Sequence, residues 1–143
     1  MAKALAQAQA AARHGDVPVG AVLVRDGVII SRGRNKREQA HHATAHAEIV
    51  ALRAAAKKLG GWNLHDCVLY VTLEPCAMCA GACVNSRIAR IVYGAPDAKG
   101  GACGSVLNIP DAPLNHHPAV TGGIMQNECA ALLSGFFRAR RKK

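Results

Sequence analysis

Four side chains of the sequence have the types and the spacing of a metal-assisted hydrolytic site. His46 precedes Glu48 by two positions, and Cys76 precedes Cys79 by three positions. On a helix, residues three apart lie on one face about one turn from each other, so both thiolates can reach a single ion. Catalytic zinc characteristically has three protein ligands and an open position for water. One histidine and two cysteines make that number, which leaves Glu48 as the general base and acid that hydrolysis requires.

Each half of this pattern says little by itself. A lone His-x-Glu is common, and a lone Cys-x-x-Cys also occurs in redox pairs and as half of a structural zinc ribbon. A redox pair usually needs a thioredoxin-like context, and the sequence lacks the second Cys-x-x-Cys of a ribbon. Together, His46-Ala47-Glu48 and Pro75-Cys76-Ala77-Met78-Cys79 match the zinc deaminase signature H-x-E…P-C-x-x-C. We therefore interpret the combination as a catalytic zinc site.

The remaining cysteines are predicted to be structural. Cys83 follows on the same helical stripe, but it lies about 10 Å along the axis from Cys76, which is too far from an ion held at the helix start. Core positions are also predicted for the cysteines without paired spacing, namely Cys67, Cys103 and Cys129.

The hydrophobic pattern gives the elements that must position these residues. Thr44 is predicted to cap a helix that runs to Lys58, and Pro75 marks the start of the next helix. The other expected elements are a helix at 2–13, strands at 19–24, 28–33, 67–73 and 89–94, a mostly irregular segment at 95–117, and a helix from 128 to about 140. This order predicts an α/β layer fold with a mixed sheet, because a hairpin is antiparallel while helix crossovers favour parallel strands.

Length and composition favour a single domain spanning residues 1–143. The sequence has no run of about 18 apolar residues, and its Ala-rich start is broken by Gln and Arg, so neither a membrane span nor a signal peptide is expected. We expect a cytoplasmic protein in a reducing compartment, whose thiols are free unless they bind metal.

The charge indicates a polyanionic partner. The net charge is +9, and five of the last six residues are basic. Without those five, the remaining 13 basic residues still outnumber the 9 acidic residues. Such an excess favours nucleic acid first and acidic membrane second, with a merely solvated surface as the alternative.

Longer segments extend the match beyond the signature. VPVGAVLV, NKREQAHHATAHAEIVALRAA, TLEPCAMCAGA, SRIARIVYGAPDAKGGACGS and ECAALLSGFFRARR together resemble the bacterial tRNA-specific adenosine deaminases, of the cytidine/deoxycytidylate deaminase superfamily, over nearly the whole chain. The resemblance implies a cytidine-deaminase-like three-layer α/β/α sandwich with a central mixed five-stranded sheet, usually as a homodimer. It also implies hydrolytic conversion of the wobble adenosine (position 34) of tRNA-Arg(ACG) to inosine with release of ammonia, on an anticodon stem-loop.

The same resemblance assigns residue roles. His46, Cys76 and Cys79 would hold one Zn²⁺ per subunit with water as the fourth ligand, and Glu48 would carry protons from that water to the base and the leaving amine. The implied substrate-binding residues are Asn35, Ala47, Asp97, Lys99, Asn115 and His116. The basic end of the chain would contact phosphates, and Phe136-Phe137 would mainly pack.

One loop departs from the family pattern. The family usually reads His-Asp-Pro-Thr-Ala-His before the glutamate, whereas residues 41–46 read His-His-Ala-Thr-Ala-His. The exchange changes the charge and the stiffness of the loop, so it bears on substrate fit or dimer contacts rather than on the zinc site.

Two rival functions remain open at this point. A free nucleobase or nucleoside deaminase, acting on guanine or cytosine, would share the zinc core but would have no use for a basic tail. A zinc-stabilised RNA-binding module without activity would have no reason to place Glu48 beside an open coordination position.

Overall fold

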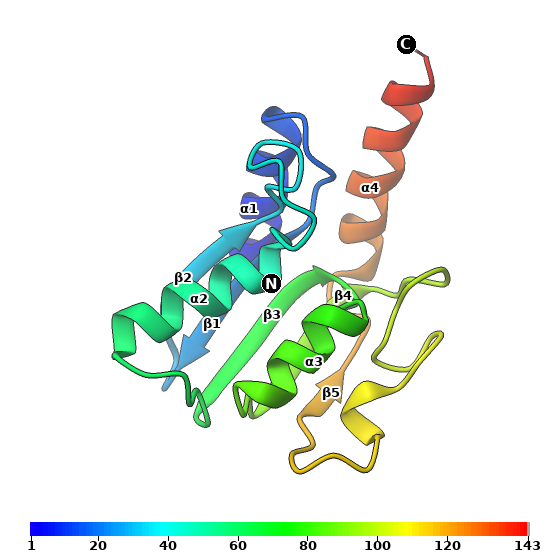
Figure 1. The fold of residues 1–143 in the computed structure, drawn as a ribbon. Helices are drawn as coiled ribbons and strands as arrows, with labels where there is room; N and C mark the ends of the chain where they lie inside the picture. Colours follow the sequence, from blue (N-terminus) through cyan, green and yellow to red (C-terminus); the bar gives the residue numbers. More distant parts are fainter. Residues whose placement is uncertain (143) are drawn as a thin grey trace.

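A five-stranded sheet with the strand order β2-β1-β3-β4-β5 forms the centre of the molecule (Figure 1). The computed structural model describes residues 1–142, and Lys143 of the basic tail lies outside the described residues. The strands are β1 (Gly20–Arg25), β2 (Val28–Arg34), β3 (Cys67–Leu73), β4 (Arg90–Ala95) and β5 (Ala119–Thr121). The helices are α1 (Ala2–Arg13), α2 (Ala47–Leu59), α3 (Ala77–Asn85), α4 (Gln126–Arg141) and the short 3-10 helix η1 (Ile109–Asp111). Within the described residues no helix combines the length and the apolar character that crossing a bilayer demands.

The sheet is mixed, which confirms the prediction from the hairpin and the helix crossovers. β1 pairs antiparallel with β2 and β3, whereas β3, β4 and β5 run parallel. Asp26 and Gly27 form the hairpin turn with φ values of 51° and 77°, the two positive φ angles that suit the twist of a tight hairpin. The residue pattern alone did not indicate β5, because this strand is only three residues long and follows a Gly- and Pro-rich segment.

Helices cover both faces of the sheet, so the three-layer α/β/α architecture is confirmed. Neighbouring positions in the hairpin show the two faces: a Cβ on Gly20 would overlap the backbone of α1, and one on Gly33 would overlap α2. Gly20 pairs with Arg34, and Gly33 pairs with the next residue of β1. Because successive residues of a strand point to opposite faces, α1 and α2 lie on opposite sides. α4 packs with α1, and α3 packs with α2.

The predicted N-cap of α2 needs correction. The cap of α2 is His46 and not Thr44, and the helix begins at Ala47. The reason is a tight turn before the helix, in which the Thr44 hydroxyl lies 2.8 Å from His42 Nδ1 and the Thr44 N–H donates to the same nitrogen. Residues 95–117 are mostly irregular as predicted, with η1 as a short element within them.

The core is built from small and branched apolar side chains. All six cysteines lie among the described residues, and each is free. Cys67, Cys83, Cys103 and Cys129 are buried, as the sequence predicts. Cys67, Cys83 and Cys103 belong to one core cluster with branched residues such as Leu69 and Ile91, both fully buried.

Candidate active site

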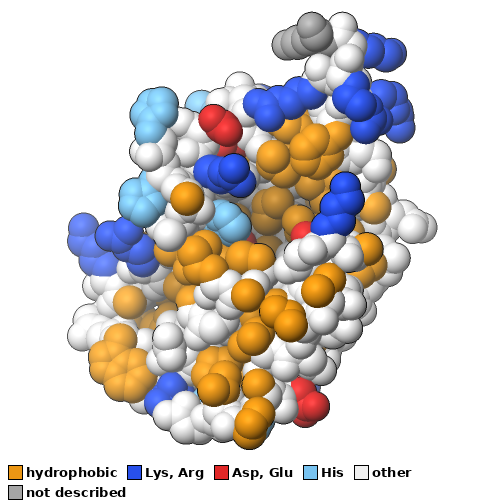
Figure 2. Space-filling model, turned by 45° about the vertical axis from the view of Figure 1, so that its right-hand side comes forward, with side chains coloured by type: hydrophobic (Ala, Val, Ile, Leu, Met, Phe, Trp, Pro, Cys, Tyr) orange, Lys and Arg blue, Asp and Glu red, His pale blue; other side chains and the backbone are white. Residues whose placement is uncertain are grey.

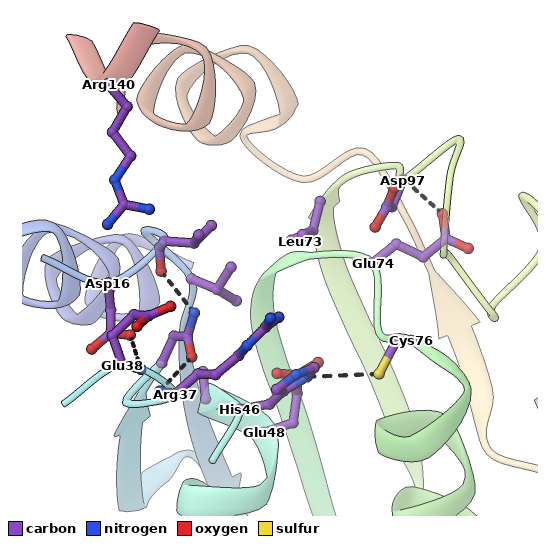
Figure 3. A pocket seen from close by; sticks show the side chains of 14 residues that line it. Asp16, Arg37, Glu38, His46, Glu48, Leu73, Glu74, Cys76, Asp97 and Arg140 are labelled. Carbon is purple, nitrogen blue, oxygen red and sulfur yellow. Dashed lines mark hydrogen bonds between the residues drawn. The ribbon is translucent and has the colours of Figure 1, made fainter. Parts of the chain in front are cut away.

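The first turns of α2 and α3 meet at one point of the fold, and each brings a metal-binding side chain as its N-cap (Figure 3). His46 caps α2, and Cys76 caps α3, both with extended backbone. Pro75 lies one residue before the N-cap Cys76, so α3 begins at Ala77, two residues later than the sequence predicts. Cys79 lies one turn further along α3 and is fully buried. The two halves of the sequence signature therefore face each other at two helix starts.

The three donor atoms fit a tetrahedral zinc ion. His46 Nδ1 lies 3.6 Å from the Sγ of Cys76 and 3.6 Å from the Sγ of Cys79. Among the described residues, this is the cluster of potential metal ligands whose donor atoms all lie within 4.8 Å of one another. A nitrogen ligand at about 2.0 Å and a sulfur ligand at about 2.3 Å from zinc, separated by a tetrahedral angle, lie roughly 3.6 Å apart. The donor set and its spacing therefore fit this metal.

The thiols of this cluster interact strongly with each other. The pKa of Cys76 is lowered to about 3, first by the hydrogen bond from the Cys79 thiol and then by that from His46. The pKa of Cys79 is raised, because its thiol donates to Cys76 and because it is buried. The positive end of the α3 dipole also favours thiolate at this point. A cation with two positive charges is the partner that would hold both sulfurs as thiolates.

Glu48 lies in the first turn of α2, next to the cluster, and is 4% exposed. Burial is the main cause that raises the pKa of its carboxyl. A carboxyl group whose pKa is raised toward neutrality can both accept and return a proton. The position and the environment of Glu48 thus suit acid–base chemistry.

A cavity of about 290 Å³ opens over these residues. Its volume is near the lower end for ligand sites, which suits one nucleoside-sized group. The lining residues are Asp16, Val17, Val19, Asn35, Arg37, Glu38, His46, Ala47, Glu48, Leu73, Glu74, Cys76, Asp97 and Arg140. Figure 2 shows this hollowed face, with Lys and Arg side chains gathered near the hollow and along the end of α4.

Three of the predicted substrate-binding residues, Asn35, Ala47 and Asp97, line the cavity. The Asn35 side chain donates to the Val17 carbonyl (3.2 Å) and accepts from the Arg37 N–H (3.1 Å). An amide side chain has two N–H donors and two carbonyl lone pairs, so Asn35 keeps one of each for a ligand. These contacts also fix the orientation of its side chain.

The other predicted contacts lie outside the cavity. Lys99 borders an adjacent hollow with Phe137, Arg140 and Arg141. Asn115 is exposed, and the His116 ring lies 2.7 Å from the Ile88 carbonyl, so the structure anchors this ring within the chain. Their roles as nucleotide contacts stay predictions.

The structure adds cavity residues that the sequence did not indicate. Asp16, just after α1, is 1% exposed and accepts hydrogen bonds from the N–H groups of Glu38 and Gln39. Arg140, taken as part of a phosphate-binding tail, donates to the Gly15 carbonyl at 2.9 Å. Figure 3 shows its side chain extending from α4 toward Asp16, just after the end of α1. Neither role has a local sequence signal, because each contact joins segments far apart in the chain.

The fold and the His-Cys-Cys-Glu site define a hydrolytic deaminase of the cytidine-deaminase-like class. The family model that matches is that of the MafB19-like deaminases, over residues 1–141. A tRNA-specific adenosine deaminase of Bacillus subtilis is 47% identical over the whole chain and 89% of its own length. A structure from studies of A-to-I editing by tRNA:A34 deaminases superposes with a TM-score of 0.88 at 46% identity, covering 91% of this chain and 95% of the other. A guanine deaminase of Nitrosomonas europaea is more distant, at 26% identity and a TM-score of 0.79 over 94% of this chain and 81% of its own.

The chain therefore belongs to the tRNA-specific adenosine deaminases, within the MafB19-like deaminase family.

Proposed function

We propose that this protein is a tRNA adenosine deaminase that hydrolyses the wobble adenosine at position 34 to inosine and releases ammonia. The observation that carries this conclusion is the buried Glu48 beside a zinc-compatible His-Cys-Cys cluster, at the base of a nucleoside-sized cavity with basic residues near it. The membership in the family of tRNA-specific adenosine deaminases, at 47% identity over the whole chain, supports the substrate. The resemblance found in the sequence further points to tRNA-Arg(ACG).

His46, Cys76 and Cys79 would hold one zinc ion per chain. When bound, zinc supplies a nucleophile at neutral pH by lowering the pKa of water to about 7. Glu48 would accept one proton from the attacking water as the water oxygen bonds to C6 of adenine, and would pass this proton to N1. Glu48 would then take the second proton from the new hydroxyl group on C6 and pass it to the departing amine, so adenosine and water become inosine and ammonia. The free N–H and lone pair of Asn35 orient the base at one of its edges.

The proposed RNA contacts extend beyond the base itself. Asp97 and Lys99, on the loop after β4, and the basic end of α4 would contact the ribose-phosphate chain around the flipped nucleotide. Phe136 lies 4.8 Å from the Arg140 guanidinium, which agrees with the packing role predicted for it, whereas Phe137 is 42% exposed. An exposed aromatic ring beside Arg140 and Arg141 can also take a stacked base.

A free guanine deaminase is the alternative function. It has structural support in the Nitrosomonas enzyme, whose fold this chain shares. The higher identity to the tRNA enzymes and the basic residues along the end of α4 favour RNA, because a small neutral base offers no phosphate to contact.

The test is a deamination assay with zinc-loaded protein on an anticodon stem-loop that carries adenine at the wobble position. Free adenosine, cytidine and guanine serve as parallel substrates. Inosine formed in the stem-loop alone, with a KM that rises steeply with salt, is expected, because phosphate contacts release counterions. Turnover of a free base or nucleoside instead of the stem-loop would overturn the substrate.

We also propose that the protein is a cytoplasmic single-domain enzyme that forms a homodimer. The outer side of α2 and α3 carries a shallow hollow bordered by apolar residues, and Trp62 beside it is 63% exposed. Exposed aromatic and aliphatic side chains of this kind are typical of subunit interfaces.

Trp62→Glu is expected to convert the dimer into a monomer, because it places a charge in the centre of an apolar interface. Light scattering of the wild type and the variant gives the mass directly. Val28→Glu is the matched control, since Val28 is exposed to a similar extent (62%) at the hairpin turn. A wild type that is monomeric at all accessible concentrations would contradict the proposal.

A further inference from the structure

Glu74, between β3 and α3, is a buried carboxylate that the reaction does not use. It is 2% exposed and lies two residues before Cys76. Its Oε1 accepts hydrogen bonds from the Asp97 N–H (3.0 Å) and from the Ser105 hydroxyl. Its Oε2 accepts from the N–H groups of Cys103 (2.9 Å) and Ser105 (3.1 Å). All four donors belong to one segment, residues 97–105, which we call the substrate loop.

The substrate loop is folded closely around this carboxylate. A Cβ at Gly101 would overlap all three carboxyl atoms of Glu74, so the loop backbone packs directly against the side chain. The Ala102 N–H donates to the carbonyl of Pro75, the residue that follows Glu74, at 2.8 Å. Both carboxyl oxygens of Glu74 therefore have hydrogen-bond donors, and every one of these donors comes from the same loop.

The start of the loop borders the cavity. Asp97 lines the cavity together with Glu74, and Figure 3 shows the two joined by a hydrogen bond above Cys76. Asp97 Oδ1 in turn accepts from the N–H groups of Lys99 and Gly100, at 3.0 and 3.2 Å. A continuous set of hydrogen bonds therefore runs from the segment that bears a metal ligand to the side chains predicted to contact RNA.

We propose that Glu74 is a positioning residue that holds the substrate loop in its RNA-binding conformation before the RNA arrives. The role rests on the proposed tRNA deaminase function. Without this carboxylate, three backbone N–H groups and one hydroxyl of the loop lose their acceptor. The RNA itself must then order the loop when it binds. That ordering cost opposes binding, whereas the chemistry at Glu48 is untouched. Loss of Glu74 therefore acts on KM more than on kcat.

Glu74→Gln is the variant that tests this role, because it keeps the size of the side chain but replaces one acceptor oxygen with an NH₂ group that faces N–H donors. Glu128→Gln is the matched control, since the same exchange occurs at an exposed position in α4. We expect KM for the stem-loop to rise about tenfold or more, the range of a lost hydrogen bond to a charged group, with zinc content unchanged and a smaller change in kcat. The control is expected to match the wild type.

Amide hydrogen exchange provides a readout that needs no activity. The N–H groups of Asp97, Cys103 and Ser105 are expected to exchange faster in Glu74→Gln, while the amides of β3 and β4 keep their protection. Ser105→Ala should raise KM by itself but add little in the Glu74→Gln background, because both changes remove part of the same network.

The outcomes separate this role from the function on which it rests. If the wild type fails to deaminate the stem-loop, the proposed function fails, and unchanged loop exchange in Glu74→Gln would then overturn the positioning role independently. With an active wild type, faster exchange together with a raised KM supports the role. An unchanged KM, or a loss of zinc in parallel with activity, overturns it.

Discussion

Glu48→Ala is expected to abolish turnover of the stem-loop while the protein keeps its zinc and its RNA. A positioned general acid–base group contributes typically ~10²–10⁴-fold to the rate, and Glu48 is the carboxylate beside the metal cluster within the cavity. The loss should lower kcat, because the side chain transfers protons during the reaction and does not bind the RNA backbone. Single-turnover assays with enzyme in excess over RNA measure this step directly.

The control for this variant must separate chemistry from folding. Glu128→Ala removes a carboxylate at an exposed position of α4 and should leave the rate unchanged. Zinc content, measured by mass spectrometry of the metal, and RNA affinity, measured by filter binding, should match the wild type in both variants. Retained activity of Glu48→Ala would remove the deaminase mechanism and restore the alternative of an RNA-binding module without catalysis.

The chemistry of the site could be predicted because the residues that carry it occur in pairs only two or three positions apart in the sequence. His46 and Glu48 share the start of one helix, and Cys76 and Cys79 share the start of the next. Each pair is fixed by helix geometry within a few residues, so the sequence needs only to bring two helix starts together. β2 and β3 both run antiparallel to β1, so they point the same way, and the helices that follow them, α2 and α3, begin at the same edge of the sheet.

The supports of the site could not be predicted, because their partners are distant in sequence. Glu74 accepts hydrogen bonds from residues 23 to 31 positions later, and Arg140 bonds a carbonyl 125 positions away. Asp16 likewise holds a loop 22 residues further on. The local hydrophobic pattern of the sequence does not predict such long-range contacts. Asp16 and Glu74 nevertheless have similar structural roles, because each is a buried carboxylate that lines the cavity and accepts hydrogen bonds from the N–H groups of a loop.

The loop that departs from the family pattern lies beside Asp16. Its residues 41–44 form a turn in which His41 adopts a φ of 53° and His42 contacts Thr44. The turn ends before the N-cap of α2, so the altered residues leave His46 in place. We therefore still expect the departure to bear on substrate or subunit contacts rather than on the metal cluster.

Cys79→Ser is expected to lose the metal, whereas Cys83→Ser should keep it. Both cysteines are fully buried on α3, four residues apart, so the two substitutions are matched in chemistry and in burial. Cys79 Sγ lies 3.6 Å from His46 Nδ1, and Cys83 is not among the clustered donors. Loss of an outer partner of a metal ligand already costs ~10–100-fold in affinity, so loss of a thiolate ligand should cost more.

Thermal unfolding with and without zinc distinguishes a ligand from a core residue. A metal present at a thousand times its Kd stabilises the folded state by about 4 kcal/mol. In a domain of this size that is a Tm increase of roughly 10 °C. The wild type and Cys83→Ser should both show this increase, with Cys83→Ser starting from a lower Tm because its hydroxyl is buried in the core. Cys79→Ser should show little increase in Tm.

The opposite result would contradict the proposed mechanism. If zinc raised the Tm of Cys79→Ser but not that of Cys83→Ser, the metal would lie deeper along α3 and away from Glu48, and the proposed mechanism would lose its nucleophile.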